Sequence, residues 1–264
     1  MRATCFAFLI PLLFVFACEG EETAPSNTLG SEIELSMTEF IDADQRILTL
    51  KFLTLKDFPC INNRIKYETT VDQQTVSIVL EKVEEAEVCL DAIGPASAFI
   101  ELGQLDEKEY DLQIQLGESI IKHGTLTVTK DAYLIHLDDE EGITLLNPAL
   151  NRVPAQTVWG TIKYENQDSK RLLNFFEEAM DIAGATDKKF AEGDYGYFRV
   201  NSDGSIVQTN GQQKELSEQA FLYDFSGKSE DIKQVLQQLN ANFQDAHVRF
   251  YNARGEEFRS WDFN

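Results

Sequence analysis

Tyr110-Asp-Leu-Gln-Ile-Gln-Leu116 alternates apolar and polar side chains along its whole length. Successive side chains of a β-strand point to opposite faces, so this alternation predicts a strand with one buried and one exposed face. Similar runs lie on either side of it, at positions 46–55, 75–83, 98–102, 124–129 and 132–137. Short strands at this spacing, with no helical period between them, predict an all-β sandwich over residues 32–138.

One part of this segment resembles a known fold family. Leu105-Asp-Glu-Lys-Glu-Tyr110-Asp-Leu112 is similar to the tyrosine corner of immunoglobulin-like and fibronectin type III domains, with Tyr110 opening a late strand. The resemblance implies an immunoglobulin-like sandwich. Leu112 stands where that family has its second cysteine, so the cysteines of this chain cannot form the family's usual pair.

The sequence period changes after a predicted linker at 139–156, which begins within the charged run 138–141 and contains two prolines. Two later stretches carry apolar side chains at helical spacing, and predicted strands at 158–164, 195–200, 221–225, 247–251 and 257–263 bracket them. The resulting order, β-α-β-β-α-β with one added strand, predicts a ferredoxin-like α+β domain at 157–264. The two helical faces consist of Leu172, Phe176, Ala179, Met180 and Ala183, and of Ile232, Val235, Leu236, Leu239 and Phe243.

The amino terminus has the pattern of an export signal. Arg2 is followed by an apolar run at 3–16, and Ala17 precedes Cys18. An apolar run of about 14 residues is too short to cross a hydrocarbon core of about 30 Å, so a cleaved signal peptide over residues 1–17 is expected. The alternatives are an ordinary secretory signal, or a buried helix with a chance cysteine.

The end of this run, Val15-Phe16-Ala17-Cys18, resembles the lipobox of bacterial lipoproteins, the cleavage site of signal peptidase II. It departs from the usual pattern at Val15, where leucine is commoner, and at Phe16, where a smaller residue is usual. The resemblance implies lipid on Cys18 and an extracytoplasmic protein anchored to a bacterial membrane, at the outer membrane on its periplasmic or cell-surface side. Residues 18–31 have no hydrophobic pattern and are expected to form a flexible tether.

The remaining cysteines agree with export. Once Cys5 is removed with the signal and Cys18 carries lipid, only Cys60 and Cys89 remain, and a lone pair in an oxidising compartment is most simply a disulfide. Closing a loop of about 30 residues would stabilise the fold by roughly 3 to 4 kcal/mol. Two cysteines without a nearby His-x-x-x-His do not make a closed zinc site, so neither metal nor cofactor is expected.

Charge narrows the class of partner. The chain carries 45 acidic against 23 basic residues, a net charge of −22. Nucleic acid is therefore disfavoured, because phosphate binding needs the opposite sign. Anionic lipid would also repel the chain, so the membrane anchor must be the acyl groups on the cysteine.

Catalytic motifs are absent from the sequence pattern. Gly117-Glu-Ser119 lacks the second glycine of a nucleophile elbow, and Asn201-Ser-Asp203-Gly204 is better explained as a tight turn than as a calcium loop. The acidic run 138–141 is more simply a solvated loop than a calcium site. The three histidines have no sequence-local nucleophile or metal partner, so no catalytic residue is predicted.

A candidate binding face comes from strand alternation in the second predicted domain. Phe198, Val200, Val248 and Phe250 are expected to face the helices, which turns their strand neighbours to the open side of the sheet. That side would be aromatic and basic, the types that dominate binding hot spots. It could take an acidic, glycan or peptide ligand, or pack on the first domain or on a second copy in a homodimer. The candidate residues are Trp159, Tyr195, Tyr197, Arg199, Arg249, Tyr251 and Trp261.

These observations favour a binding or assembly lipoprotein of the bacterial envelope. An extracytoplasmic hydrolase and a lipoprotein inhibitor or immunity factor are the alternatives. A histidine within hydrogen-bond reach of both a carboxylate and a serine would favour the hydrolase.

Overall fold

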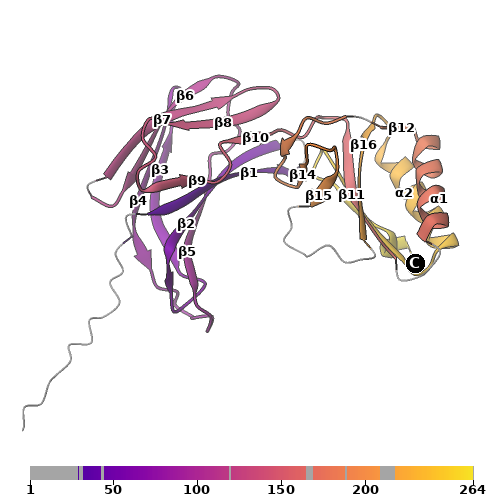
Figure 1. Ribbon diagram of the computed structural model, residues 1–264, viewed down its shortest axis with the longest axis horizontal. Coiled ribbons are helices and arrows are strands. Elements are labelled where there is room, and N and C mark those ends of the chain that lie inside the picture. Colours follow the sequence, from indigo (N-terminus) through magenta and orange to yellow (C-terminus); the bar gives the residue numbers. More distant parts are fainter. Residues whose placement is uncertain are drawn as a thin grey trace, which may run out of the picture.

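A computed structural model describes residues 29, 32–42, 45–118, 120–164, 169–187, 189–208 and 218–263. Two β-rich bodies lie side by side (Figure 1): the first is a curled sheet, and the second is a smaller sheet with two helices against one face. Cys18, the predicted signal peptide and most of the predicted tether lie outside the described residues.

The first body is one mixed sheet in the order β10-β8-β7-β6-β4-β3-β5-β2-β1-β9. The sheet curls until its two ends meet across residues 146–148, where the Leu146 N–H donates to the Leu35 carbonyl and the Ile135 N–H donates to the Pro148 carbonyl. Its strands are β1 (Ile33–Asp42), β2 (Gln45–Phe58), β3 (Arg64–Val71), β4 (Thr75–Glu84), β5 (Gly94–Glu101), β6 (Glu109–Leu116), β7 (Ile120–Val128), β8 (Ala132–Leu137), β9 (Ile143–Leu145) and β10 (Ala149–Asn151). Because β9 and β10 pair within this sheet, part of the expected linker belongs to the first body.

The expected immunoglobulin-like sandwich is wrong. Parallel pairings of β4 with β6, β3 with β5 and β1 with β9 join all the strands into one sheet instead of two facing ones. The local feature behind the resemblance is nevertheless present, since buried Tyr110 opens β6 and its hydroxyl accepts a hydrogen bond of 3.0 Å from the Asp106 N–H. A short corner motif therefore does not fix how distant strands pair.

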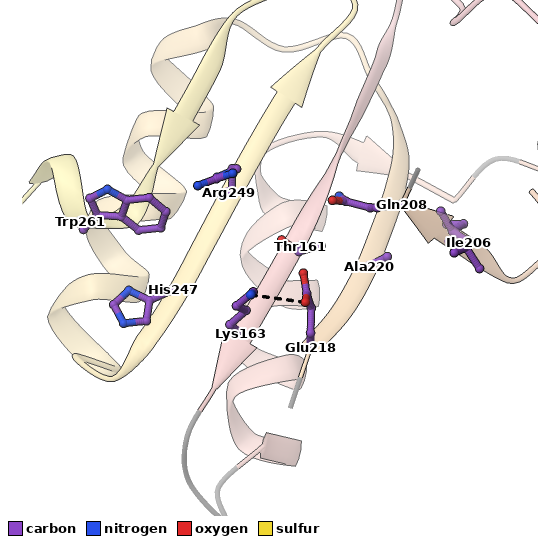
Figure 2. Close-up of a pocket in the computed structure, with 10 residues that line it drawn as sticks. Thr161, Lys163, Ile206, Gln208, Glu218, Ala220, His247, Arg249 and Trp261 are labelled. Carbon is purple, nitrogen blue, oxygen red and sulfur yellow. Dashed lines mark ion pairs between the residues drawn. The ribbon is translucent and has the colours of Figure 1, made fainter. Parts of the chain in front are cut away.

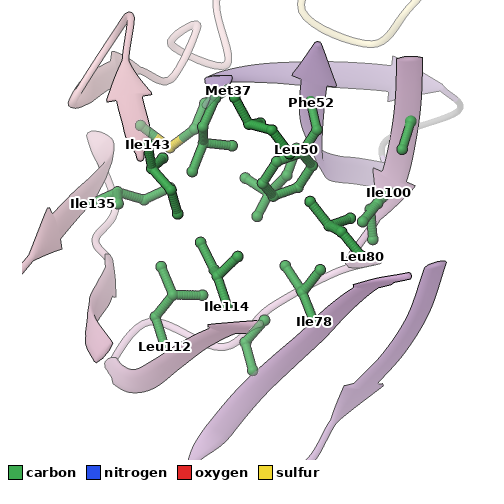
Figure 3. Packing of buried hydrophobic residues seen from close by; sticks show 14 of the residues in the cluster. Met37, Leu50, Phe52, Ile78, Leu80, Ile100, Leu112, Ile114, Ile135 and Ile143 are labelled. Atoms are coloured by element: carbon green, nitrogen blue, oxygen red, sulfur yellow. The ribbon is translucent and has the colours of Figure 1, made fainter. Parts of the chain in front are cut away.

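The curled sheet encloses a single apolar core. Alternate side chains from nearly every strand point into it, as Figure 3 shows for Met37, Leu50, Phe52, Ile114 and Ile135. These side chains are at most 4% exposed. The inward halves of the alternating patterns thus supply the core.

The predicted disulfide is confirmed. Cys60 and Cys89 are bonded, with Cα atoms 5.2 Å apart and a sequence separation of 29. The bond joins the segment after β2 to the loop between β4 and β5.

The second body contains a five-stranded sheet in the order β12-β16-β11-β17-β18. Helices α1 (Ser169–Ile182) and α2 (Ser229–Asn242) cover one face, and the predicted apolar faces of both helices pack there. At the start of α2 the Lys228 N–H donates to the Asp231 carboxylate over 2.8 Å. The strands are β11 (Thr157–Tyr164), β12 (Ala185–Thr186), β16 (Glu218–Phe225), β17 (Ala246–Asn252) and β18 (Glu257–Arg259), followed by the short helix η1 (Ser260–Phe263).

The expected ferredoxin-like domain is also wrong. After α1 and β12 the chain leaves the main sheet and builds a separate three-stranded sheet from β13 (Gly193–Asp194), β14 (Phe198–Val200) and β15 (Ile206–Gln208). In the main sheet, β11 pairs antiparallel with both of its neighbours, β16 and β17. The two helices form with the expected apolar faces, but the strands between them are more numerous than expected, and the segment at 193–208 joins a different sheet.

A buried ionic cluster lies where the two bodies meet. The Glu39 carboxylate, whose side chain is fully buried, lies 3.0 Å from Arg46 and 3.3 Å from Arg152. It also accepts a hydrogen bond of 2.9 Å from the Tyr133 hydroxyl. Arg46 donates in turn to the carbonyl of Val153, in the segment that enters the second body. The cluster therefore ties β1, β2 and β8 to the connection between the bodies.

Candidate binding groove

Strand register arranges the helix-free face of the five-stranded sheet in rows. Residues opposite one another on paired strands share a face and lie side by side. One row is Leu222, Trp159 and Tyr251; the next is Ala220, Thr161 and Arg249; the third is Glu218, Lys163 and His247. The first row is covered by other side chains and the other two rows are open, and this difference creates the site.

The first row is covered by the three-stranded sheet. The Trp159 ring centroid lies 5.2 Å from that of Tyr197 and 5.7 Å from that of Phe198, and Trp159 is only 2% exposed. Tyr195 stacks on Phe198 in the same cluster, at 4.9 Å. The expectation that Phe198 and Val200 face the helices is therefore wrong, because β14 packs on the opposite face of the main sheet. Val248 and Phe250, on β17, do pack against the helices.

The other two rows remain open and form a groove of about 770 Å³. Its floor is low because Thr161 and Ala220 are small where Trp159 and Leu222, two positions along the same strands, are large. Figure 2 shows Trp261 and His247 on one side of this floor and β15, which carries Ile206 and Gln208, on the other. We call this site the sheet groove.

Ion pairs hold the charged side chains of the sheet groove. Lys163 lies 3.5 Å from Glu218 on the floor, and Arg249 lies 3.3 Å from Glu257 at the edge. Arg259 binds the same Glu257 carboxylate at 2.8 Å, and its hydrogen bond holds the pKa of Glu257 below the usual range. The groove thus presents cations in fixed positions, with carboxylates beside them.

The aromatic wall of the sheet groove is Trp261. The Arg249 and Arg259 guanidinium carbons lie 5.6 and 6.0 Å from its ring centroid, within the range of cation–π attraction. The His247 ring meets Trp261 edge-on at 5.7 Å. Trp261 remains partly exposed, so a flat apolar surface stands beside positive charge.

The structure separates the seven candidate binding residues. Arg249 and Trp261 line the sheet groove, whereas Trp159, Tyr195, Tyr197 and Tyr251 belong to the cluster that supports the covered row. Arg199 is exposed on β14, away from that cluster. The other residues of the sheet groove, among them Lys163, His247, Thr161, Glu218, Ala220 and β15, were not predicted as part of a site. The sequence feature that could have indicated the groove is the decrease in side-chain size from Trp159 to Thr161, two positions along the same strand.

Among the described residues, no hydrogen bond joins a histidine side chain to a serine, and no three His, Cys, Asp or Glu side chains cluster to hold a metal ion. His123 and His136 are exposed on the first sheet, and Asn201-Ser-Asp203-Gly204 forms the tight turn between β14 and β15, as predicted. No helix among the described residues is long and apolar enough to span a membrane.

Comparisons with known proteins identify no relative, so a function can be argued only from the site described above. No protein-family model, no curated protein and no solved structure matches the chain.

Proposed function

We propose that the protein is a lipid-anchored, extracytoplasmic binding protein of the bacterial envelope, and that the sheet groove holds its ligand. The observation that carries this proposal is the groove itself, an open hollow of about 770 Å³ with an aromatic wall and fixed cations. Hollows of this size, with a few convergent polar groups, are typical of small-ligand sites. The lipobox-like ending at Cys18 supports the anchor and the location.

The lining chemistry favours a ligand that carries both a flat apolar face and a carboxylate. Trp261 offers a ring on which a sugar or peptide group can stack, while Arg249 and Lys163 offer charge-assisted hydrogen bonds. Thr161 and Gln208 add neutral hydrogen-bonding groups. An acidic glycan or an acidic peptide supplies all the complementary groups.

Filling the sheet groove should weaken ligand binding strongly. In Ala220→Phe, a phenyl ring occupies the floor beside Thr161, and we expect the affinity for the ligand to fall by a factor of about 100, which corresponds to about 2.7 kcal/mol. Titration calorimetry with oligogalacturonate and with an oligoglutamate peptide measures this directly. Ala241→Phe, at an exposed position of α2 on the other side of the sheet, is the matched control. Equal binding by wild type and Ala220→Phe, or binding of neither probe by wild type, would count against the proposed ligand site.

The anchor has its own test. Cys18→Ala should abolish fatty-acid incorporation and release the protein from membranes, because the acyl groups are attached through that sulfur. Metabolic labelling with a fatty-acid analogue, followed by membrane fractionation, gives both readouts. Replacing Cys5, which precedes the predicted cleavage site, is the control. Undiminished labelling of the Cys18→Ala protein would exclude a lipid anchor at this position.

A further inference from the structure

Four large apolar side chains are exposed together at one end of the first body. They are Ile61, Val88, Leu90 and Ile93, with exposed fractions of 47, 75, 58 and 76%. They stand on the two segments that the Cys60–Cys89 disulfide joins. We call this surface the apolar tip. A contiguous patch of exposed apolar side chains marks an interaction surface, whereas apolar side chains that are exposed singly need no such explanation.

The apolar tip is held rigid in its exposed conformation. Besides the disulfide, the Asn62 amide donates to the Val88 carbonyl over 2.7 Å and accepts from the Leu90 N–H at 3.0 Å. The Asn63 side chain accepts from the Ala86 N–H at 3.1 Å. With these bonds the loop cannot fold its apolar side chains away without breaking contacts, and little conformational entropy remains to be lost when a partner covers them.

The chain enters the first body at the same end. Ile33, the first residue of β1, lies opposite Thr54, and the Leu55 N–H donates to the Glu32 carbonyl. β2 reaches the apolar tip only a few residues later, at Phe58. The segment from Cys18 to Leu29 spans at most about 40 Å even when fully extended. A lipid on Cys18 would therefore keep this end of the body close to the bilayer.

We propose that the apolar tip rests in the interfacial layer of the bilayer that carries the lipidated Cys18, an inference that rests on the proposed lipid anchor. A short tether keeps the tip at high effective concentration near the surface, so contacts that would be weak in free solution become populated. Exposed apolar side chains can enter the boundary between headgroups and acyl chains without spanning the membrane.

Charge specifies the kind of bilayer. Glu85, Glu87 and Asp91 are exposed around the apolar tip. These carboxylates repel anionic headgroups and would face one another if two copies met tip to tip, which disfavours both partners. A zwitterionic surface carries no such penalty. The second body, with the sheet groove, joins the first body beside β10 (Figure 1), whereas the apolar tip lies beyond the end of β2.

Depth-dependent quenching tests the inference on the acylated full-length protein. A fluorescent amino acid is placed at position 88, or at position 182 as a matched control, because Ile182 is 80% exposed on α1 of the second body. Each acylated protein is reconstituted in phosphatidylcholine vesicles that contain a doxyl-labelled lipid quencher. We expect quenching at position 88 to exceed that at position 182 at least about threefold, to disappear in the Leu90→Asn, Ile93→Asn variant, and to weaken when phosphatidylglycerol is added.

The outcomes separate the tip from the anchor. Equal quenching at positions 88 and 182 in an acylated, vesicle-bound protein overturns tip docking and leaves the lipid anchor standing. Quenching that survives in the double asparagine variant also overturns tip docking. So does a blue shift of the fluorescence at position 88 that grows with protein concentration in the absence of lipid, because it would indicate contact with a second copy. Absence of acylation instead contradicts the proposed anchor, and with it the reason for the tip to face a bilayer.

Discussion

Trp159→Ala is expected to destabilise the second body by roughly 3 to 5 kcal/mol, as large aromatic deletions in cores do. Trp159 is the central residue of the covered row, and its ring contacts Tyr197, Phe198 and Tyr251 within 6 Å. Alanine would leave a cavity between the five-stranded sheet and β14. Urea denaturation, followed by fluorescence or circular dichroism, measures the change in the free energy of unfolding.

The matched control for this deletion is Trp261→Ala. Trp261 is partly exposed on the wall of the sheet groove, so its loss should cost about 1 kcal/mol or less of stability. It should instead weaken ligand binding by about 30-fold, the effect of losing a binding hot spot of about 2 kcal/mol. The two tryptophans thus separate a packing role from a binding role on one sheet face. A Trp159→Ala protein as stable as wild type would show that the covered row is not the support described above.

Local structure was predictable from the sequence because it depends on side-chain period alone. The alternation in residues 110–116 gave a strand, and helical spacing identified the buried faces of α1 and α2. Strand pairing was not predictable in the same way. Period two says which side chains share a face, but it carries no information on which distant strand supplies the hydrogen bonds.

The candidate site shows the same division. Period two places Trp159 and Lys163, four residues apart on β11, on the same side of the strand, yet it could not show that β14 would cover Trp159 and leave Lys163 open. That outcome depends on the chain leaving the main sheet between β12 and β16, which no local signal announces. The hollow is likewise a property of several strands together, since Thr161 of β11 and Ala220 of β16 are opposite one another only in the folded register.

Glu39→Ala is expected to lower the free energy of unfolding by roughly 3 to 5 kcal/mol, because it removes the common partner of two arginines. The Arg46 and Arg152 side chains are only 17 and 15% exposed, so neither can recover its lost interactions fully in water. The Tyr133 hydroxyl loses its acceptor as well. Chemical denaturation measures the loss, and Glu101→Ala, at an exposed position of β5, controls for removing one carboxylate from an acidic chain.

Glu39→Ala should also loosen the connection between the two bodies, because the ionic cluster lies where they meet. Arg46 also donates to the Val153 carbonyl, and the Ile41 N–H, near the end of β1, donates to the Tyr197 hydroxyl over 2.8 Å. Glu39 therefore fixes an arginine that holds the connection between the bodies. In Glu39→Ala we expect faster amide hydrogen exchange at residues 152–156 and in β14, while the core of the first sheet remains protected. If exchange in these segments matches wild type and stability falls by less than about 1 kcal/mol, the cluster does not set how the two bodies are joined.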